Sequence, residues 1–438
     1  MKKNAANPRY TVIIPTKDRC EYLFHTLKTC SEQDYDNFEV IVSDDGSKDD
    51  TRGVVEEASR KDSRIKYIKP ENGSGMLYNF EYALDQVKDG YVTALGGDDG
   101  LIPNSISDID TIFKQYPYDV LTWPTPIYSY PSEYDKSGRL VIKAKFGRPL
   151  NGQKILKSTD IINKQIQNLE YVGDSELPMF YVKSMVSTDV VKKVKSITPN
   201  NVFYACSVPD GYSGIAIAGV IDEYIFSGKP FSIFGSSHKS TGNAYLDSTK
   251  KSLEIANNFF NSVSKVPLHK KLGSAPYSPL IAIMTADFLF TADDLNGWKG
   301  DISKLDIKNI IEKSLKELKN GNWAKDNVSR ELAIIKRIAE QYSLEDYFHN
   351  QVNSLKRNTK KEIRGNAISS KQIYIDASDY GIENILDAAY FCKFIHNAGE
   401  NVSLKSLLKG VTNSISHKIS TKKNAGGFPP ESEWPNLG

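Results

Sequence analysis

Two adjacent aspartates, Asp98 and Asp99, are the strongest candidates for chemistry in this sequence. They follow the small apolar run ALGG and precede GLIP, so they stand at the end of what reads as a buried strand. Neighbouring carboxylates repel each other, and a divalent cation is the usual counter-charge for such a pair. Aspartate and glycine are also ordinary turn residues, so a solvated Asp-Gly turn is the alternative interpretation. The elements around the pair must decide between the two.

Four strand patterns alternate with helical patterns over the first part of the chain. We expect strands at 10–15, 38–43, 65–69 and 91–95, with amphipathic helices between them. Such alternation predicts an α/β fold with a parallel sheet, in which ligands bind beyond the carboxyl ends of the strands. Polar loops that follow the strands should therefore converge at one edge of the sheet, and these are Thr16 to Arg19, Asp44 to Ser47, and Asp98 with Asp99.

Carboxylates grouped beside backbone amides suit a nucleoside diphosphate. A divalent cation held by one or two carboxylates completes its shell with water and phosphate oxygens, and it stabilises the charge that grows on a leaving diphosphate. The chain has no GxxxxGK[ST] motif, and its first strand is followed by PTKDR in place of GxGxxG. Both common nucleotide-binding loops are therefore disfavoured. The pattern that remains is that of sugar-nucleotide enzymes.

Four consecutive motifs resemble the nucleotide-binding half of the family-2 glycosyltransferases, which have the GT-A fold. They read YTVIIPTKDR, FEVIVSDDGSKDDT, ENGSGMLYNFEYAL and YVTALGGDDGLIP, and they end before residue 110. The resemblance implies a Rossmann-like, mostly parallel sheet with helices on both faces, followed here by a C-terminal helical region. The nucleotide-binding residues that it implies are Pro15, Thr16, Asp18, Arg19, Asp44, Asp45, Asn72, Gly97 and Asp98.

The same resemblance implies the reaction. It is the inverting transfer of a sugar from a nucleoside-diphosphate donor, expected to be UDP-linked, to a hydroxyl of a glycan or lipid-linked glycan, as in bacterial surface-polysaccharide synthesis. Asp98, Asp99 and the late His238 are implied to bind Mn²⁺ or Mg²⁺, and Asp210 in VPDGYSGIAIA is implied to be the catalytic base. A carboxylate in that role accepts the proton of the acceptor hydroxyl.

Several of these residues also have ordinary structural interpretations. Asp210 is equally well read as a turn aspartate, and a lone histidine such as His238 is more often a surface or hydrogen-bonded residue. Gly96 stands where the family motif has its first aspartate, which removes one contact, either to the ribose or to the groups around the metal. A non-catalytic subunit that binds a nucleotide sugar or a glycan is therefore the alternative function. A nucleotidyltransferase is disfavoured, because TKDRC offers no glycine-rich phosphate loop.

Composition excludes several other classes. The 438 residues carry 56 basic and 54 acidic side chains, a formal net charge of +2, which argues against a dedicated nucleic-acid binder. The start lacks the apolar core of a secretory signal, and no apolar run suits a membrane span, so we expect a cytoplasmic protein. The four scattered cysteines lack metal-site spacing and predict unpaired thiols.

Changes in sequence texture predict four segments. Residues 1–110 and 111–245 are the expected nucleotide-binding and acceptor-binding halves of the GT-A domain. Residues 246–408 read as a helical domain that shapes the acceptor site or joins copies of the chain in a homo-oligomer. Residues 409–438, rich in lysine, glycine and proline, read as a disordered tail, with peripheral contact to the inner face of a membrane as an alternative role.

Overall fold

The computed structural model of the chain describes most of the sequence. The described residues are 7–71, 75–132, 135–145, 148–206, 208–240, 266–321, 323–355, 358–359, 365–398, 423–424, 427–435 and 437.

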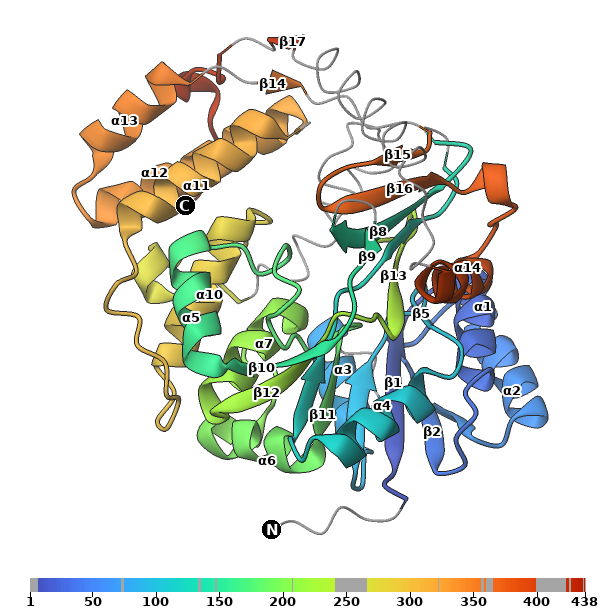
Figure 1. The fold of residues 1–438 in the computed structure, drawn as a ribbon. Coiled ribbons are helices and arrows are strands. Elements are labelled where there is room, and N and C mark those ends of the chain that lie inside the picture. Colours follow the sequence, from blue (N-terminus) through green and yellow to red (C-terminus); the bar gives the residue numbers. More distant parts are fainter. Residues whose placement is uncertain are drawn as a thin grey trace.

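An eight-stranded sheet forms the centre of the molecule (Figure 1). The pairs β1–β2, β1–β4, β2–β3 and β6–β12 are parallel, whereas β11 is antiparallel to both of its neighbours and β10 is antiparallel to β12. The sheet is therefore mixed but mostly parallel, as predicted. In spatial order its strands are β10 (Gln153–Lys157), β12 (Glu223–Ser227), β6 (Val120–Thr122), β11 (Ser184–Ser187), β4 (Tyr91–Ala94), β1 (Tyr10–Thr16), β2 (Phe38–Asp44) and β3 (Ile65–Ile68).

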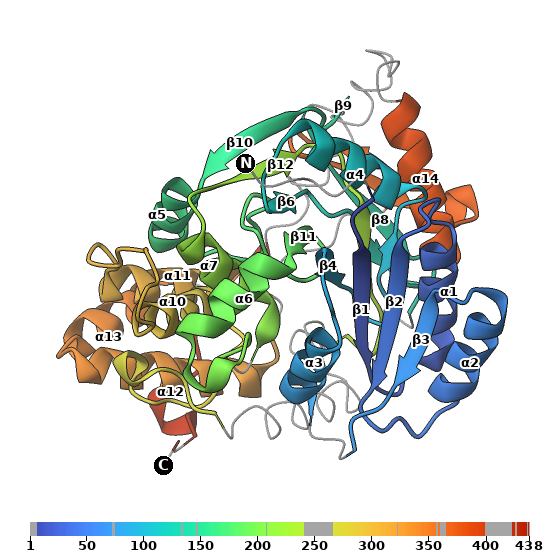
Figure 2. The same ribbon diagram turned by 90° about the horizontal axis from the view of Figure 1, so that it is seen from below.

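Strand β1 shows why the sheet needs helices on both faces. Its residues are buried from end to end, with Val12 and Ile14 in one apolar core and Ile13 in another. A strand covered on both sides reads as a continuous run of β-branched residues, which is what TVIIP supplies. One face packs against α1 (Cys20–Ser31), α2 (Thr51–Lys61) and α4 (Ser105–Gln115), and the other against α3 (Met76–Asp85), α6 (Thr188–Ile197) and α7 (Pro209–Val220) (Figure 2).

A second, smaller sheet lies beyond the carboxyl ends of the central strands (Figure 1). Its strand β13 pairs with β5, which directly follows the Asp98–Asp99 turn. Helix α14 (Ile385–Ala398) packs beside α1 and β5. In spatial order the strands are β15 (Ala367–Ile368), β16 (Gln372–Asp376), β8 (Arg139–Lys145), β7 (Ile127–Ser129), β13 (Ser232–Ser236) and β5 (Gly100–Leu101), with β9 (Arg148–Pro149) on β8.

This second sheet differs from the expected domain division. Strand β16 and helix α14 fall in the segment 246–408, which the sequence assigned to a helical domain, yet β16 pairs with β8 of the preceding segment along its whole length. The alternating run QIYID carries a strand signal, but it is short and stands alone among helical patterns. Residues 365–398 are thus part of the wall beside the sheet edge.

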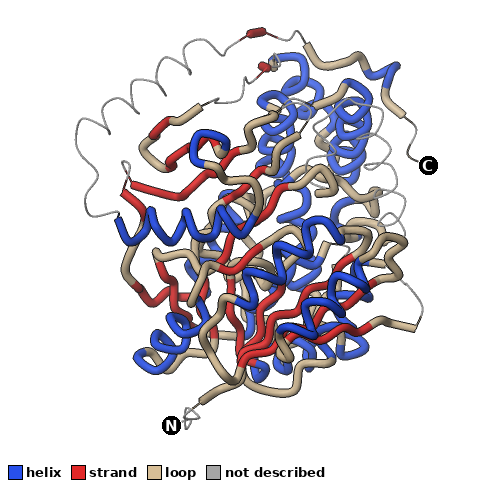
Figure 3. Tube along the Cα trace, turned by 90° about the vertical axis from the view of Figure 1, so that its right-hand side faces the viewer, coloured by secondary structure: helices blue, strands red, loops and turns tan. Residues whose placement is uncertain are grey.

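A helical layer packs against α7 and one face of the large sheet. Helix α10 (Ile281–Asp293) is buried almost all round and contacts both α7 and α11 (Ile307–Asn320). One continuous apolar core joins these helices to the sheet, so the layer is not separately packed. The side view in Figure 3 shows helices on either side of the strands. The layer also contains α5 (Ser158–Asn168), η2 (Lys270–Leu272), α12 (Lys325–Gln341) and α13 (Glu345–Ser354). The remaining short elements are η1 (Pro199–Asn201) beside α6, η3 (Ser378–Tyr380) beside β16, and the paired strands β14 (Asn358–Thr359) and β17 (Lys423–Asn424).

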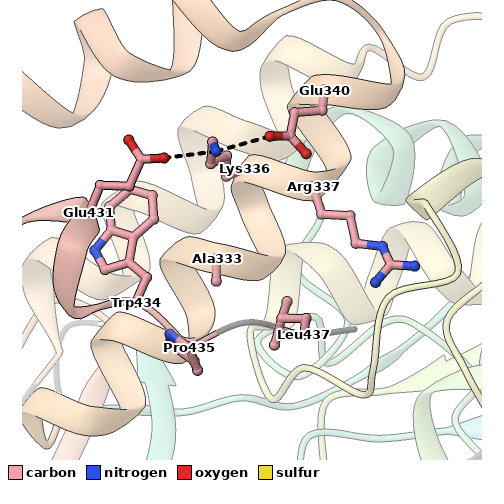
Figure 4. Close-up of a pocket in the computed structure, with 8 residues that line it drawn as sticks. All are labelled: Ala333, Lys336, Arg337, Glu340, Glu431, Trp434, Pro435 and Leu437. Atoms are coloured by element: carbon pink, nitrogen blue, oxygen red, sulfur yellow. Dashed lines mark ion pairs between the residues drawn. The ribbon is translucent and has the colours of Figure 1, made fainter.

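The segment 427–435 packs on this layer, which corrects the expectation of a disordered tail there. The rings of Trp434 and Phe348 lie 5.8 Å apart, and Lys336 forms ion pairs with Glu431 and Glu340 at 2.7 and 3.0 Å (Figure 4). The short helix η4 (Glu431–Glu433) lies between these contacts. The composition of the tail, rich in lysine and proline, did not indicate that Trp434 packs against Phe348. Residues 409–422 of the expected tail lie outside the described residues.

A surface hollow of about 430 Å³ separates this segment from α12 (Figure 4). Trp434 and Leu437 line one side, and Lys336 and Arg337 line the other. Both cations already have partners within the chain. Lys336 forms its two ion pairs, and Arg337 Nε donates to the Gly273 carbonyl at 2.9 Å.

Among the described helices, none is long and apolar enough to cross a membrane.

Candidate functional site

Three polar loops meet at the carboxyl ends of the central strands, where the strand order leads one to expect them. The backbone N–H of Asp45 donates to the Thr16 carbonyl at 3.0 Å. Asp18 joins the same two loops through its side chain, which accepts from the Lys48 N–H at 2.6 Å. Its φ of 52° turns the chain sharply after β1. The third loop is attached through the ion pair between Arg19 and Asp98.

Asp98 is the charge centre of the site. Its carboxylate is 1% exposed, and Oδ1 accepts from Nη1 of Arg19 at 2.7 Å. Oδ2 accepts from the hydroxyls of Ser237 and Ser240 at 2.7 and 2.9 Å. The Tyr130 hydroxyl fixes the backbone by donating to the Asp98 carbonyl at 3.0 Å. The first loop and the segment after β13 therefore both bind this single carboxylate.

Asp99 is held in a different way. It is fully buried, and its two oxygens accept backbone N–H bonds from Gly96 at 2.6 Å and from Gly235 at 2.7 Å. Burial, followed by the nearby Asp98 charge, raises the pKa of Asp99 to about 7. A solvated Asp-Gly turn is therefore the wrong interpretation of this pair. The counter-charge that the structure supplies is the Arg19 guanidinium.

The predicted metal ligands fit a divalent cation unequally. Both oxygens of Asp99 are used by backbone N–H groups, so this residue does not fit as a ligand. The His238 ring is engaged through Nδ1 with the Tyr22 hydroxyl at 2.6 Å. Asp98 is bonded only to side chains that can rotate away, so it fits as one carboxylate ligand. Within the described ranges no group of three or more His, Cys, Asp or Glu side chains is placed to hold a metal.

The loop after β2 is arranged around Asp44. Its carboxylate accepts from the Ser47 N–H and from the Tyr67 hydroxyl, both at 2.8 Å. The neighbouring Asp45 pairs with Lys17 at 3.1 Å. These contacts hold the loop in place beside the end of β1. Asn72, the remaining polar residue predicted on this side, lies outside the described residues.

Thr16 ends β1 with a buried hydroxyl that points into the site. Its Oγ1 has no hydrogen-bond partner among the described residues. A Cβ added to Gly97 would lie 2.7 Å from this oxygen, so glycine leaves the hydroxyl room for a partner. Pro15, one residue earlier, is buried within β1 opposite Ser43. A buried hydroxyl left unbonded is costly, so a ligand that bonds it would be stabilised.

Asp210 lies in the first turn of α7. The turn follows from Pro209, which suits a first helical position, and the carboxylate accepts from the Gly211 N–H at 2.7 Å. Burial raises the pKa of Asp210, and the nearby Lys183 cation opposes that rise. Burial raises the pKa of the Tyr181 phenol, and the charges of Asp99, Asp98 and, more weakly, Asp210 raise it further.

Several residues of the site carried no usable sequence signal. Tyr181 follows the Asp98–Asp99 turn by about eighty positions, and only the fold brings it beside Asp99. Ser237 and Ser240 flank the predicted His238, so the SSHKS run did mark their loop. Three aromatic residues of the segment 120–130, Trp123, Tyr128 and Tyr130, are buried core residues, as is usual for aromatics in a strand.

Comparison with known proteins covers the segment that carries the three polar loops of this site. Residues 11–166 match the model of glycosyl transferase family 2. This family 2 segment carries the loops after β1 and β2 and the Asp98–Asp99 turn, so the resemblance seen in the sequence motifs is confirmed there.

Relatives match this chain over part of their length. A GalNAc(5)-diNAcBac-PP-undecaprenol beta-1,3-glucosyltransferase from Campylobacter jejuni is 39% identical over 103 residues, which is 23% of this chain and 33% of that protein. An uncharacterized glycosyltransferase, the MG025 homolog of Mycoplasma pneumoniae, is 26% identical over 207 residues, 45% of this chain and 64% of that protein. The chain therefore spans from a third to just under two thirds of these relatives.

A solved structure of S. aureus TarS 1-349 in complex with UDP-GlcNAc aligns with 83% of this chain and 95% of its own. The sequence identity is 14% and the TM-score is 0.43.

Proposed function

We propose that the chain is a glycosyltransferase that moves a sugar from a nucleoside-diphosphate sugar, with uridine as the expected base, to a hydroxyl of a glycan or lipid-linked glycan. The observation that carries this proposal is the meeting of three polar loops around Asp98, within the segment that matches family 2. In an open α/β sheet, ligands bind at this edge.

The donor side is assigned to Thr16 and Asp44, which end β1 and β2, and to Arg19 in the loop after β1. The unbonded hydroxyl of Thr16 and the ordered loop around Asp44 face the nucleoside, and Arg19 faces the diphosphate. Arginine binds phosphate oxygens through its planar fork of N–H donors. Asp98 is proposed as the one protein carboxylate for Mn²⁺ or Mg²⁺, a cation that neutralises charge on the leaving diphosphate when bound.

The acceptor side is assigned to Asp210. Its carboxylate accepts the proton of the attacking hydroxyl as the acceptor oxygen forms a bond to the anomeric carbon. The bond from that carbon to the diphosphate oxygen breaks at the same time, and its electron pair leaves with the diphosphate. Attack from the face opposite the leaving group inverts the anomeric centre. A raised pKa makes this buried carboxylate a stronger base than an exposed aspartate.

Release of nucleoside diphosphate tests the proposal. Purified chain is incubated with single UDP-, GDP-, dTDP- and CDP-sugars and a glycan-lipid extract, with Mn²⁺ or with EDTA. We expect release from one nucleotide class, and a loss of about a hundredfold in Asp98→Ala, since an ionic contact to the diphosphate is removed. Asp222→Ala is the control, because that carboxylate is exposed and pairs with Lys299. Equal release by Asp98→Ala and the wild type would contradict the proposal.

A further inference from the structure

One backbone residue near the site is strained. Val182 has a φ of 63°, in the left-handed region that β-branched residues avoid. Its N–H donates to the carbonyl of Ala94 at 2.7 Å, so the strained residue is fixed to the end of β4, just before the Asp98–Asp99 turn. Such strain persists only where the surroundings impose it, and it is concentrated at functional sites. The residue that this geometry presents to the site is its neighbour, Tyr181.

The Tyr181 hydroxyl occupies the space in front of Gly96. A Cβ built on Gly96 would lie 2.6 Å from the Tyr181 oxygen, so no larger residue fits at position 96 while the tyrosine stays. The ring is held from two sides, with centroids 6.1 Å from Phe80 and 6.4 Å from Phe234. The family motif has an aspartate at this position. In this chain the polar group beside position 96 is the Tyr181 hydroxyl, which comes from the segment before β11.

Tyr181 is partly buried, and its phenol is bonded to the Asp99 carboxylate. Its hydroxyl donates to the Asp99 carboxylate, which helps to satisfy that buried charge. A hydroxyl that donates one bond retains lone pairs that can accept another. Burial and the nearby carboxylates raise the pKa of Tyr181, so the group stays a neutral phenol. It is therefore placed to accept a hydrogen bond from a ligand hydroxyl.

We propose that Tyr181 contacts the transferred sugar and helps to select it, an inference that rests on the proposed function. In an in-line displacement the anomeric carbon lies between the leaving diphosphate and the base. The Tyr181 hydroxyl lies against Gly96, beside the Asp98–Asp99 turn assigned to the diphosphate, and the charge of Asp210, assigned as the base, also acts on it. The ligand chemistry that it recognises is a hydroxyl of the donor hexose, which donates to the phenol oxygen.

The test separates the sugar from the nucleotide. Tyr181→Phe removes the hydroxyl and keeps the ring, and we expect kcat/KM for the nucleotide sugar to fall about tenfold. The Kd of the free nucleoside diphosphate should stay within about twofold, because that ligand lacks the sugar. The ratio of kcat/KM for the natural donor to kcat/KM for its deoxy analogues should also become smaller. Tyr212→Phe is the matched control, since that buried hydroxyl has no hydrogen-bond partner among the described residues.

Four outcomes overturn the inference. Equal weakening of nucleoside diphosphate and nucleotide sugar would make Tyr181 a structural residue, and unchanged kinetics would remove it from the site. Failure of the wild type to use any nucleotide sugar would reject the proposed function itself, which is a distinguishable result. If Tyr181→Phe does not fold, the wild type provides the second measurement, in which binding of the nucleotide sugar is compared with binding of its deoxy-sugar analogues. At least one deoxy analogue should bind more weakly, and equal binding of all of them would overturn the inference.

Discussion

The sheet edge and the helical layer both contain buried carboxylates, but they use them in opposite ways. At the edge, Asp98 accepts from the side chains of Arg19, Ser237 and Ser240, which come from two distant loops. In the helical layer, Glu317 accepts the N–H groups of Ile281 and Ala282 at 2.8 and 2.9 Å. That carboxylate satisfies the start of α10, whose first N–H groups have no partner within the helix. Burial alone therefore does not mark a reactive carboxylate, and the convergence of loops from several strands is the feature that separates Asp98 from Glu317.

The largest expected difference between the regions is catalytic. Asp210→Asn should reduce sugar transfer about a thousandfold while nucleotide binding persists, because only the proton acceptor is lost. The wild type should also lose activity as the pH falls below the raised pKa of Asp210, since the base must be ionised. Initial rates of nucleoside diphosphate release measure both effects.

Asp287→Asn is the matched control from the helical layer. Asp287 is also buried, with its pKa raised to about 6 by burial, and it accepts the His269 N–H at 2.6 Å. The asparagine retains an acceptor oxygen, so transfer rates should stay near those of the wild type. A large loss of transfer in this variant, with the fold intact, would break the contrast between the two regions.

A smaller effect is expected on stability from the helical core. Leu315 is fully buried in α11, and Leu315→Ala should lower the free energy of unfolding by about 2–5 kcal/mol. The transfer rate per folded molecule should not change, because the layer packs behind α7 and supplies no reacting group. Denaturant unfolding and kinetics at a matched folded fraction measure the two quantities. A loss of transfer without a loss of stability would place α11 in the site.

The free energy of unfolding should also depend on pH through Glu317. Burial raises the pKa of Glu317 to about 7 in the folded chain, above the ordinary value of 4.5. The unfolded chain loses this proton first, so the stability associated with it is present below about pH 4.5 and is lost as the pH rises to 7. Relative to Glu317→Gln, the wild type should lose about 3 kcal/mol across that window. Parallel stability profiles of the two proteins would contradict this.

The smallest expected effect is at the surface of the helical layer. Lys336 pairs with Glu340 and Glu431, all partly exposed. Lys336→Ala should reduce the free energy of unfolding by at most about 1 kcal/mol, and less in high salt, because exposed ion pairs are weak and screened. A loss above about 3 kcal/mol would mean that the segment 427–435 is a larger part of the fold than these contacts indicate.

The polar loops of the site could be predicted from the sequence because each lies next to its strand in the chain. Strand, loop and helix repeat three times, and each loop carries its polar residues directly after an apolar run, as at Thr16 and Asp44. The topology of a parallel sheet then brings these loops together. The fold class followed from the same periodicity, which depends on neighbouring residues.

The rest could not be read from the sequence, because it depends on contacts between distant segments. Tyr181 reaches Asp99 only through the strained turn at Val182, which a sequence pattern does not announce. The pairing of β16 with β8 joins residues more than two hundred positions apart. The role of Gly96 was similarly hidden: the reason for a glycine there is the Tyr181 hydroxyl in front of it.

The central claim is that the sheet edge around Asp98 binds a nucleoside diphosphate. Titration calorimetry of UDP, GDP, dTDP and CDP into the wild type and Asp98→Ala, with Mn²⁺ and with EDTA, tests it most directly. We expect one of the four nucleoside diphosphates to bind more tightly than the others. Mn²⁺ should strengthen this binding, and Asp98→Ala should abolish it. Absence of binding by every nucleotide, or equal binding by the wild type and Asp98→Ala, would contradict it.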